Sequence, residues 1–237
     1  MEDYKRILVK VSGEALMGEE PFGTSPSGVS LVAEKIYTLH QAGKEVAIVT
    51  GGGNFFRGIQ QVAKTGLART PADQVGMLAT LMNGVLLKEA LTHLGCEVRM
   101  MSSLVCPTIA DPYKWEKAMR HLKRGRVLLF VGGTGHPYFT TDTTAALRAS
   151  EIEADIFLKA TTRVDGIYDS DPRKQAGAKK YDSLSFEQVL EKKLGILDLS
   201  AVTMCMTANI PIKVFNFYEG SFLEALNSPS FGTIVTG

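Results

Sequence analysis

The sequence predicts an α/β fold in which a mostly parallel central sheet carries helices on both faces, in three layers. Short β-branched runs alternate with helix-length amphipathic segments, which is the pattern of successive βαβ units. Gly43, Gly95 and Gly125 each follow a periodic segment, where a helix commonly ends in a left-handed residue. Two apolar runs also end in glycine-containing loops, and the strand ends of such sheets are where ligands bind.

The elements follow one another in a regular order. Strands are expected at residues 7–11, 46–50, 98–101, 127–131 and 156–159, and helices at 30–42, 74–93, 112–123 and 142–151. Residues 161–180 are polar and rich in aspartate, which predicts a hairpin or a long functional loop. Ser185 with Gln188 predicts a capping box. Met and Leu in 77–91 exceed one core-facing stripe, so a second face buried at a subunit contact is an alternative to core packing.

Length and composition restrict the classes of protein. A chain of 237 residues fits one large domain or two closely fused lobes. The net charge of +1 produces no strong positive field to attract a polyanion, so nucleic acid is not expected as a main partner. Three cysteines without C-x-x-C spacing favour a reducing, cytoplasmic location over a disulfide framework. No targeting segment is evident, and no apolar stretch approaches the roughly 18 to 20 residues that span a bilayer.

Two junctions between a strand and a glycine loop predict a site for a phosphorylated ligand. Lys10, Ser12 and Gly13 stand at the end of the first apolar run, and residues 51–54 read Gly-Gly-Gly-Asn, with Arg57 close behind. Glycine lets backbone N–H groups approach phosphate oxygens, and the basic side chains add positive charge. The alternatives are a lysine that reaches solvent and an ordinary tight turn. Neither a P-loop nor a dinucleotide-binding fingerprint is present.

Residues 132–142 form the densest ligand-like run, with glycines, hydroxyls and two aromatic residues before a predicted helix. Thr141 or Asp142 could cap that helix, and the aromatic residues could instead belong to the core. Asp73 is expected at the start of a long helix, either as a cap or as an acceptor for ligand hydroxyls. The acidic stretch 165–172 lacks the spacing of a calcium-binding loop and favours a turn that faces a nucleotide.

Taken in order, these segments resemble the bacterial uridylate kinases of the amino-acid kinase superfamily. The resemblance runs almost end to end, through residues 4–16, 51–58, 77–84, 133–142, 164–166 and 171–172. It implies the amino-acid kinase fold and transfer of the γ-phosphoryl group of ATP to UMP, with Mg²⁺ and without a covalent intermediate. Such chemistry needs positioning and charge neutralisation rather than a nucleophile.

The resemblance also implies roles for particular residues. Lys10 and Arg57 would be the catalytic cations. ATP would be held by Lys10, Val11, Ser12, Gly13, Gly53, Arg57, Thr162, Tyr168 and Asp171. UMP would be held by Gly52, Asp73, Thr134, Gly135, His136, Pro137, Tyr138, Phe139, Thr140 and Thr141. Residues 1–150 would mainly serve the phosphoryl acceptor, and residues 151–237 the ATP nucleoside.

Several choices stay open at this level. The usual run Ala-Thr-Lys-Val-Asp-Gly has an extra residue here, so either Thr161 or Thr162 could contact ATP. Asp142 could orient Lys10 or magnesium, or cap its helix, and the metal ligands are not assigned. The resemblance further implies a homohexamer, with UTP as inhibitor and GTP as possible activator through Lys88, Arg99 and Arg126. A small carboxylate or carbamate acceptor, and a nucleotide-binding protein without turnover, are the other functions considered.

Overall fold

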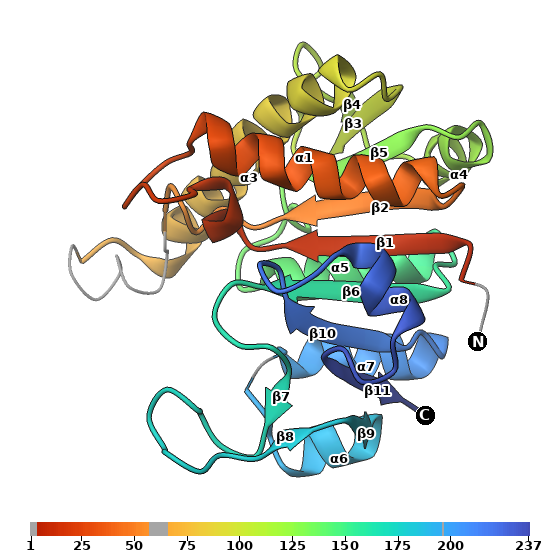
Figure 1. The fold of residues 1–237 in the computed structure, drawn as a ribbon. Coiled ribbons are helices and arrows are strands. Elements are labelled where there is room, and N and C mark those ends of the chain that lie inside the picture. Colours follow the sequence, from red (N-terminus) through yellow and green to blue (C-terminus); the bar gives the residue numbers. More distant parts are fainter. Residues whose placement is uncertain (1–3, 57–65, 196) are drawn as a thin grey trace.

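A computed structural model describes residues 4–56, 66–195 and 197–237 (Figure 1), so Arg57 lies outside the described residues. Within these ranges one nine-stranded sheet runs in the order β4-β3-β5-β2-β1-β6-β10-β11-β9. Its neighbouring strands are parallel except for β10 and β11. The prediction of a mostly parallel sheet is confirmed.

The strands of the large sheet are β1 (Arg6–Val11), β2 (Glu45–Thr50), β3 (Val98–Ser102), β4 (Asp111–Pro112), β5 (Val127–Val131), β6 (Ile156–Thr161), β9 (Ser183–Ser185), β10 (Ile212–Asn216) and β11 (Thr233–Thr236). A separate antiparallel hairpin, β7 (Ile167–Tyr168) with β8 (Lys180–Tyr181), lies in the stretch where a hairpin or loop was expected. All five expected strands are present, each extended by at most two residues.

The helices are η1 (Gly13–Leu16), α1 (Pro26–Gln41), α3 (Arg69–His93), α4 (Trp115–Lys123), α5 (Thr141–Glu151), α6 (Phe186–Glu191), α7 (Leu199–Ala208) and α8 (Phe222–Asn227). Helix α1 begins earlier than expected because the Ser25 side chain accepts from the N–H of Gly28 and Pro26 opens the first turn. The capping box of Ser185 and Gln188 opens α6, as predicted.

The helices cover both faces of the sheet (Figure 1), because alternate residues of each buried strand point to opposite sides. Helices α1, α3 and α8 pack in one apolar cluster with Ile7 and Val9 of β1. Helices α4, α5, α6 and α7 pack in the other, with Leu8 of β1. Lys10 follows the same alternation and therefore projects toward α5. The predicted three-layer arrangement is confirmed.

Two predicted helix caps are wrong. Asp73 lies inside α3, which begins at Arg69 after Ala68, so its carboxylate does not cap the helix. At α5 the cap is Thr140, whose hydroxyl accepts from the N–H groups of Asp142 and Thr143. Asp142 stands one residue into that helix, and its carboxylate is left for other partners.

Helix α3 has two apolar faces. Met77, Leu81, Leu87 and Leu91 are buried, whereas Leu78, Met82 and Leu86 are 54%, 50% and 40% exposed. Among the described helices it alone is long and apolar enough to cross a membrane, with a mean hydropathy of 1.2. No apolar stretch of that length was expected from the sequence. Its packing against the sheet makes it a core helix here, and the exposed stripe is its second apolar face.

Candidate functional site

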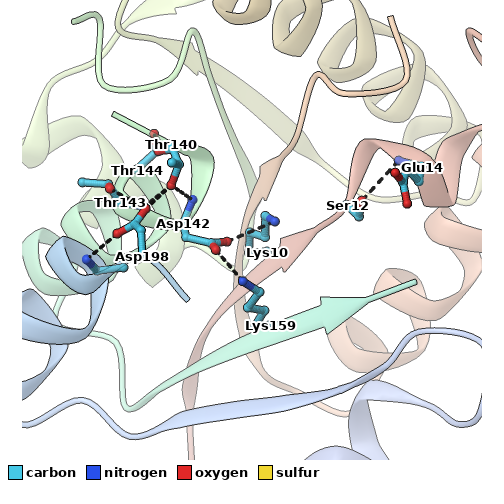
Figure 2. Close-up of polar contacts among 10 residues, drawn as sticks. Lys10, Ser12, Glu14, Thr140, Asp142, Thr143, Thr144, Lys159 and Asp198 are labelled. Carbon is cyan, nitrogen blue, oxygen red and sulfur yellow. Dashed lines mark hydrogen bonds and ion pairs between the residues drawn. The ribbon is translucent and has the colours of Figure 1, made fainter. Parts of the chain in front are cut away.

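Three charged side chains meet where β1 and β6 end and α5 begins (Figure 2). Lys10 and Lys159 are directly paired in register on these adjacent parallel strands. Asp142 of α5 lies between them, with Oδ1 3.0 Å from the Nζ of Lys10 and Oδ2 accepting from the Nζ of Lys159. The side chains of Lys10 and Asp142 are both 13% exposed. We call these three residues the lysine–aspartate cluster.

Burial and charge act against each other in the lysine–aspartate cluster. Burial raises the pKa of Asp142, but the two ammonium groups outweigh it and hold that pKa at about 2. Burial lowers the pKa of Lys159; Asp142 opposes this shift and Lys10 adds to it. Asp142 thus permits two cations to share a site where their repulsion alone would be costly. The cluster carries a net positive charge beside the N-terminus of α5, which favours anions.

Asp198 fixes the N-terminus of α5 from the side of α7 (Figure 2). Its Oδ2 accepts from the hydroxyls of Thr140 and, at 2.8 Å, Thr143. Its Oδ1 accepts from the N–H of Ala201 at 2.7 Å and so caps α7. The helix that carries Asp142 is therefore tied to a second helix as well as to the lysines.

The two glycine loops pack directly against each other. A Cβ at Gly13 would lie 2.7 Å from the carbonyl oxygen of Gly51 and 2.4 Å from Oδ1 of Asn54, so a side chain there cannot be accommodated. The amides of Asn54 and Asn83 exchange hydrogen bonds of 2.8 and 2.9 Å, and Asn83 also donates to the Gly51 carbonyl at 2.7 Å. This buried amide pair holds the loop after β2 in place.

A cavity of about 250 Å³ opens on one side of the lysine–aspartate cluster. It is lined by Lys10, Ser12, Glu14, Lys159, Ala160, Thr161, Thr162, Arg163, Val164 and Arg173. A neighbouring cavity of about 360 Å³ shares Val164 and Arg173 with it and includes Tyr168 and Asp171. We call the two together the donor groove, because they would accommodate an elongated ligand with its charged end at the lysines.

Thr161 and Thr162 both line the donor groove, but their hydroxyls donate to different acceptors. Thr162 donates to Oε2 of Glu14 at 2.8 Å, whereas Thr161 donates to the carbonyl of Val164 within its own turn. Two guanidinium nitrogens of Arg163 donate to the Glu14 carboxylate, at 3.0 Å to Oε2 and 2.5 Å to Oε1. Glu14 therefore ties the loop after β6 to the loop after β1.

The acidic hairpin is internally bonded. The hydroxyl of Tyr168 donates to Asp165 at 2.5 Å, and this bond raises the pKa of Tyr168 to about 12. Arg173 donates to both carboxylate oxygens of Asp171 and lowers the pKa of that partly exposed carboxyl to about 2. Both predicted residues face the donor groove while holding the hairpin together.

A third cavity, of about 120 Å³, lies on the other side of the N-terminus of α5, and we call it the acceptor cavity. It is lined by Gly52, Gly53, Phe56, Ala72, Asp73, Gly76, Met77, Thr80, Gly133, Phe139, Thr140, Thr141 and Thr144. Close packing shapes its floor, since a Cβ at Gly52 would lie 2.6 Å from the Gly76 carbonyl oxygen.

Asp73 connects α3 with the loop before α5. Its Oδ2 accepts from Nε of Arg69 and from the N–H of Tyr138, both at 2.7 Å. The guanidinium of Arg69 also lies 5.2 Å from the centre of the Tyr138 ring. Tyr138 has a φ of 73°, an uncommon value for a non-glycine residue, so these contacts hold a strained turn.

The structure thus brings most of the sequence-predicted residues to two places around one charged cluster. Gly53 lies on the acceptor side, although it was expected to serve ATP. Residues 134–138 do not line the acceptor cavity, and His136 bonds within its own turn through the hydroxyl of Thr134.

Sequence reasoning missed Lys159 and Asp198. Lys159 follows an apolar run on a predicted strand, as Lys10 does, and that shared pattern was the available signal. Asp198 had no comparable signal, because its role depends on the packing of α7 against α5.

Comparison with known proteins gives consistent matches. Residues 5–216 match the amino acid kinase family. The chain is 49% identical to the uridylate kinase of Protochlamydia amoebophila over 98% of this chain and 92% of that one. It is also 49% identical to the uridylate kinase of Magnetococcus marinus, over 94% and 91% of the respective chains. The crystal structure of UMP kinase from Bacillus anthracis superposes with a TM-score of 0.94 at 35% identity, covering 99% and 97% of the two chains.

Proposed function

We propose that this chain, which belongs to the amino acid kinase family and within it to the uridylate kinases, transfers the γ-phosphoryl group of ATP to UMP. The products are ADP and UDP, and the reaction is a step of pyrimidine nucleotide synthesis. The observation that carries the proposal is the lysine–aspartate cluster. It lies at the N-terminus of α5, with the donor groove on one side and the acceptor cavity on the other.

The acceptor needs no catalytic base. A phosphate monoester has its second pKa near 6, so at neutral pH an oxygen of UMP is already ionised and can attack the γ-phosphorus directly. The bond from that oxygen to phosphorus forms while the bond to the bridging oxygen of ADP breaks. The main obstacle is that two highly charged phosphates must approach each other, and buried cations lower this barrier.

Lys10 and Lys159 are the cations that we assign to the transferring group. Both line the donor groove, and their shared partner Asp142 fixes where their ammonium groups lie. The N–H groups at the start of α5 add a further positive potential. Arg57, the other cation that the resemblance implies, is retained in the proposal on that ground alone.

On the acceptor side we assign UMP to the cavity that contains Asp73 and Phe139, with Gly52, Thr140 and Thr141. One oxygen of Asp73 already orders the Tyr138 turn, and the carboxylate offers its second oxygen to a ribose hydroxyl. Residues 134–138 would meet the base as the continuation of the same loop. In this assignment residues 1–150 mainly serve the acceptor.

On the donor side we assign the ATP phosphates to residues 10–13 and the nucleoside to Thr162, Tyr168 and Asp171, so residues 151–237 mainly serve the donor nucleoside. The protein carboxylates nearest the cluster are already engaged, Asp142 by two lysines and Asp198 by hydroxyls and a backbone N–H. No group of three metal-ligating side chains occurs among the described residues. These observations favour magnesium that enters as the Mg–ATP substrate, held by phosphate oxygens and water.

Assembly and regulation complete the proposal. The exposed apolar stripe of α3 would be covered in a cytoplasmic homo-oligomer, for which the resemblance implies a hexamer. UTP would inhibit by occupying the acceptor cavity. GTP, as possible activator, would bind near Arg99 and Arg126, whose guanidinium groups both contact Glu97, at 3.0 and 2.7 Å.

The experiment is ADP release from Mg–ATP with UMP, CMP, dTMP, acetylglutamate, glutamate and aspartate offered one at a time. Turnover selective for UMP supports the proposal. Turnover with an amino acid only would keep the donor groove and overturn the acceptor. Absence of turnover with every acceptor, together with tight binding of ATP and UMP, would identify a nucleotide-binding protein instead.

A further inference from the structure

A buried arginine reaches the loop of the acceptor cavity through a single serine hydroxyl. Arg148 of α5 is 5% exposed, and its guanidinium carbon lies 3.5 Å from the centre of the Tyr113 ring. One nitrogen, Nη2, donates to Oγ of Ser103 at 2.8 Å. That Oγ donates in turn to the carbonyl oxygen of Gly133, also at 2.8 Å. Ser103 belongs to the loop after β3, so three separate segments meet in this chain of bonds.

The direction of the two hydrogen bonds is fixed by chemistry. A guanidinium has only donors, so the Ser103 oxygen must accept from Arg148. The single proton of the hydroxyl is then directed to Gly133. Arg148 itself is held by an ion pair with Glu151 and by the aromatic ring beneath it, so the serine has one preferred orientation.

The hydrogen bond to the Gly133 carbonyl orients the whole peptide group between Gly133 and Thr134. Because a trans peptide is planar, holding the Gly133 carbonyl on the side of Ser103 places the N–H of Thr134 on the opposite side. Gly133 has a φ of 59° and lines the acceptor cavity. The loop also lies close to the serine at its next glycine, since a Cβ at Gly135 would be 3.3 Å from the Ser103 Cβ.

From this geometry we infer that Ser103 is a positioning residue for the acceptor nucleotide, acting through Gly133 and oriented by Arg148. The inference rests on the proposed function, because it concerns the same acceptor cavity. It separates the two substrates, since neither Ser103 nor Arg148 lines the donor groove. Loss of the serine hydroxyl therefore weakens binding of the acceptor and leaves that of ATP unchanged.

The first test is steady-state kinetics of Ser103→Ala with UMP and ATP varied separately. We expect KM for UMP to rise about 3- to 10-fold, the effect of one ordinary hydrogen bond, while kcat and KM for ATP stay within about 2-fold. Ser103→Thr keeps the hydroxyl and should restore KM for UMP. Ser150→Ala is the matched control, because that α5 hydroxyl donates to the Ala146 carbonyl of its own helix, and the variant should change neither KM.

The second test asks whether Arg148 acts through Ser103. Arg148→Lys should raise KM for UMP on its own and add nothing further in the Ser103→Ala background. Emission of the single tryptophan and thermal unfolding verify that each variant is folded. Multiplying effects in the double variant would overturn the relay, and equal changes in both KM values, or none, would overturn the role of Ser103. If the wild type ignores UMP, the proposed function fails first, and the acceptor that it does use replaces UMP in both tests.

Discussion

Replacing Lys159 with methionine removes one cation from the lysine–aspartate cluster while nearly preserving the volume of the side chain. Lys159 is 6% exposed, and burial already lowers its pKa, so its charge is costly to maintain in the folded protein. Asp142 keeps its contact with Lys10 at 3.0 Å in the variant. Because Asp142 keeps this second partner, no buried charge is left uncompensated, and we expect the free energy of unfolding to change by less than about 2 kcal/mol.

The loss of activity should be far larger. An ammonium about 4 Å from a charge that develops in the transition state contributes about 4 kcal/mol at an effective dielectric constant near 20. Since each 1.36 kcal/mol is a factor of ten in rate, Lys159→Met should lower kcat about 10³-fold. The prediction is therefore a separation of catalysis from stability at one position.

The assay is ADP release at saturating UMP and Mg–ATP, with urea unfolding of the same preparation. Lys213→Met is the matched control. Lys213 is also a buried strand lysine whose pKa is lowered by burial, but its Nζ donates to the Pro229 carbonyl at 3.0 Å, away from the cluster. That control should retain its kcat, because it leaves the lysine–aspartate cluster intact. A kcat within tenfold of wild type for folded Lys159→Met would refute the role of Lys159.

Three further predictions follow from the same contacts. Asp142 has its pKa lowered from 3.8 to about 2, so its stabilising effect of about 2 kcal/mol is present above pH 4 and lost as the pH falls toward 2. The deficit in unfolding free energy of Asp142→Asn should therefore shrink over that range, and a deficit independent of pH would contradict the assigned pairing. Asp73→Ala should raise KM for UMP about 10-fold or more and leave KM for ATP unchanged. An unchanged rate with UMP would show that Asp73 does not bind UMP. Arg163→Gln should raise KM for ATP only about 2- to 5-fold, because the Arg163 side chain in the pair with Glu14 is 48% exposed, and a rise confined to KM for UMP would oppose the donor assignment.

Local patterns in the sequence were enough to predict five of the nine described strands of the large sheet and its three-layer arrangement. Apolar runs and glycine stops marked five strands and four helices, and only the ends moved. Asp73 shows where such reasoning fails. The helix already begins at Arg69. Arg69 and Asp73 lie four positions apart, and the ion pair between them favours helix.

The centre of the site depends on pairings between distant segments. Lys10 was identified from its own strand, but its neighbour Lys159 is set by the register of β1 with β6, which no local pattern specifies. The choice between capping and charge pairing for Asp142 was decided by Thr140, one residue outside the helix. The link from Arg148 through Ser103 needed three segments in place and could only be found in the folded chain.

The most direct test of the central claim is ³¹P NMR of the wild-type protein with Mg–ATP and UMP, following all phosphorus signals with time. The account predicts that UDP appears one for one with ADP as UMP is consumed, and that inorganic phosphate does not accumulate. ADP formed together with inorganic phosphate, while UMP remains intact, would contradict the assignment of UMP as the acceptor.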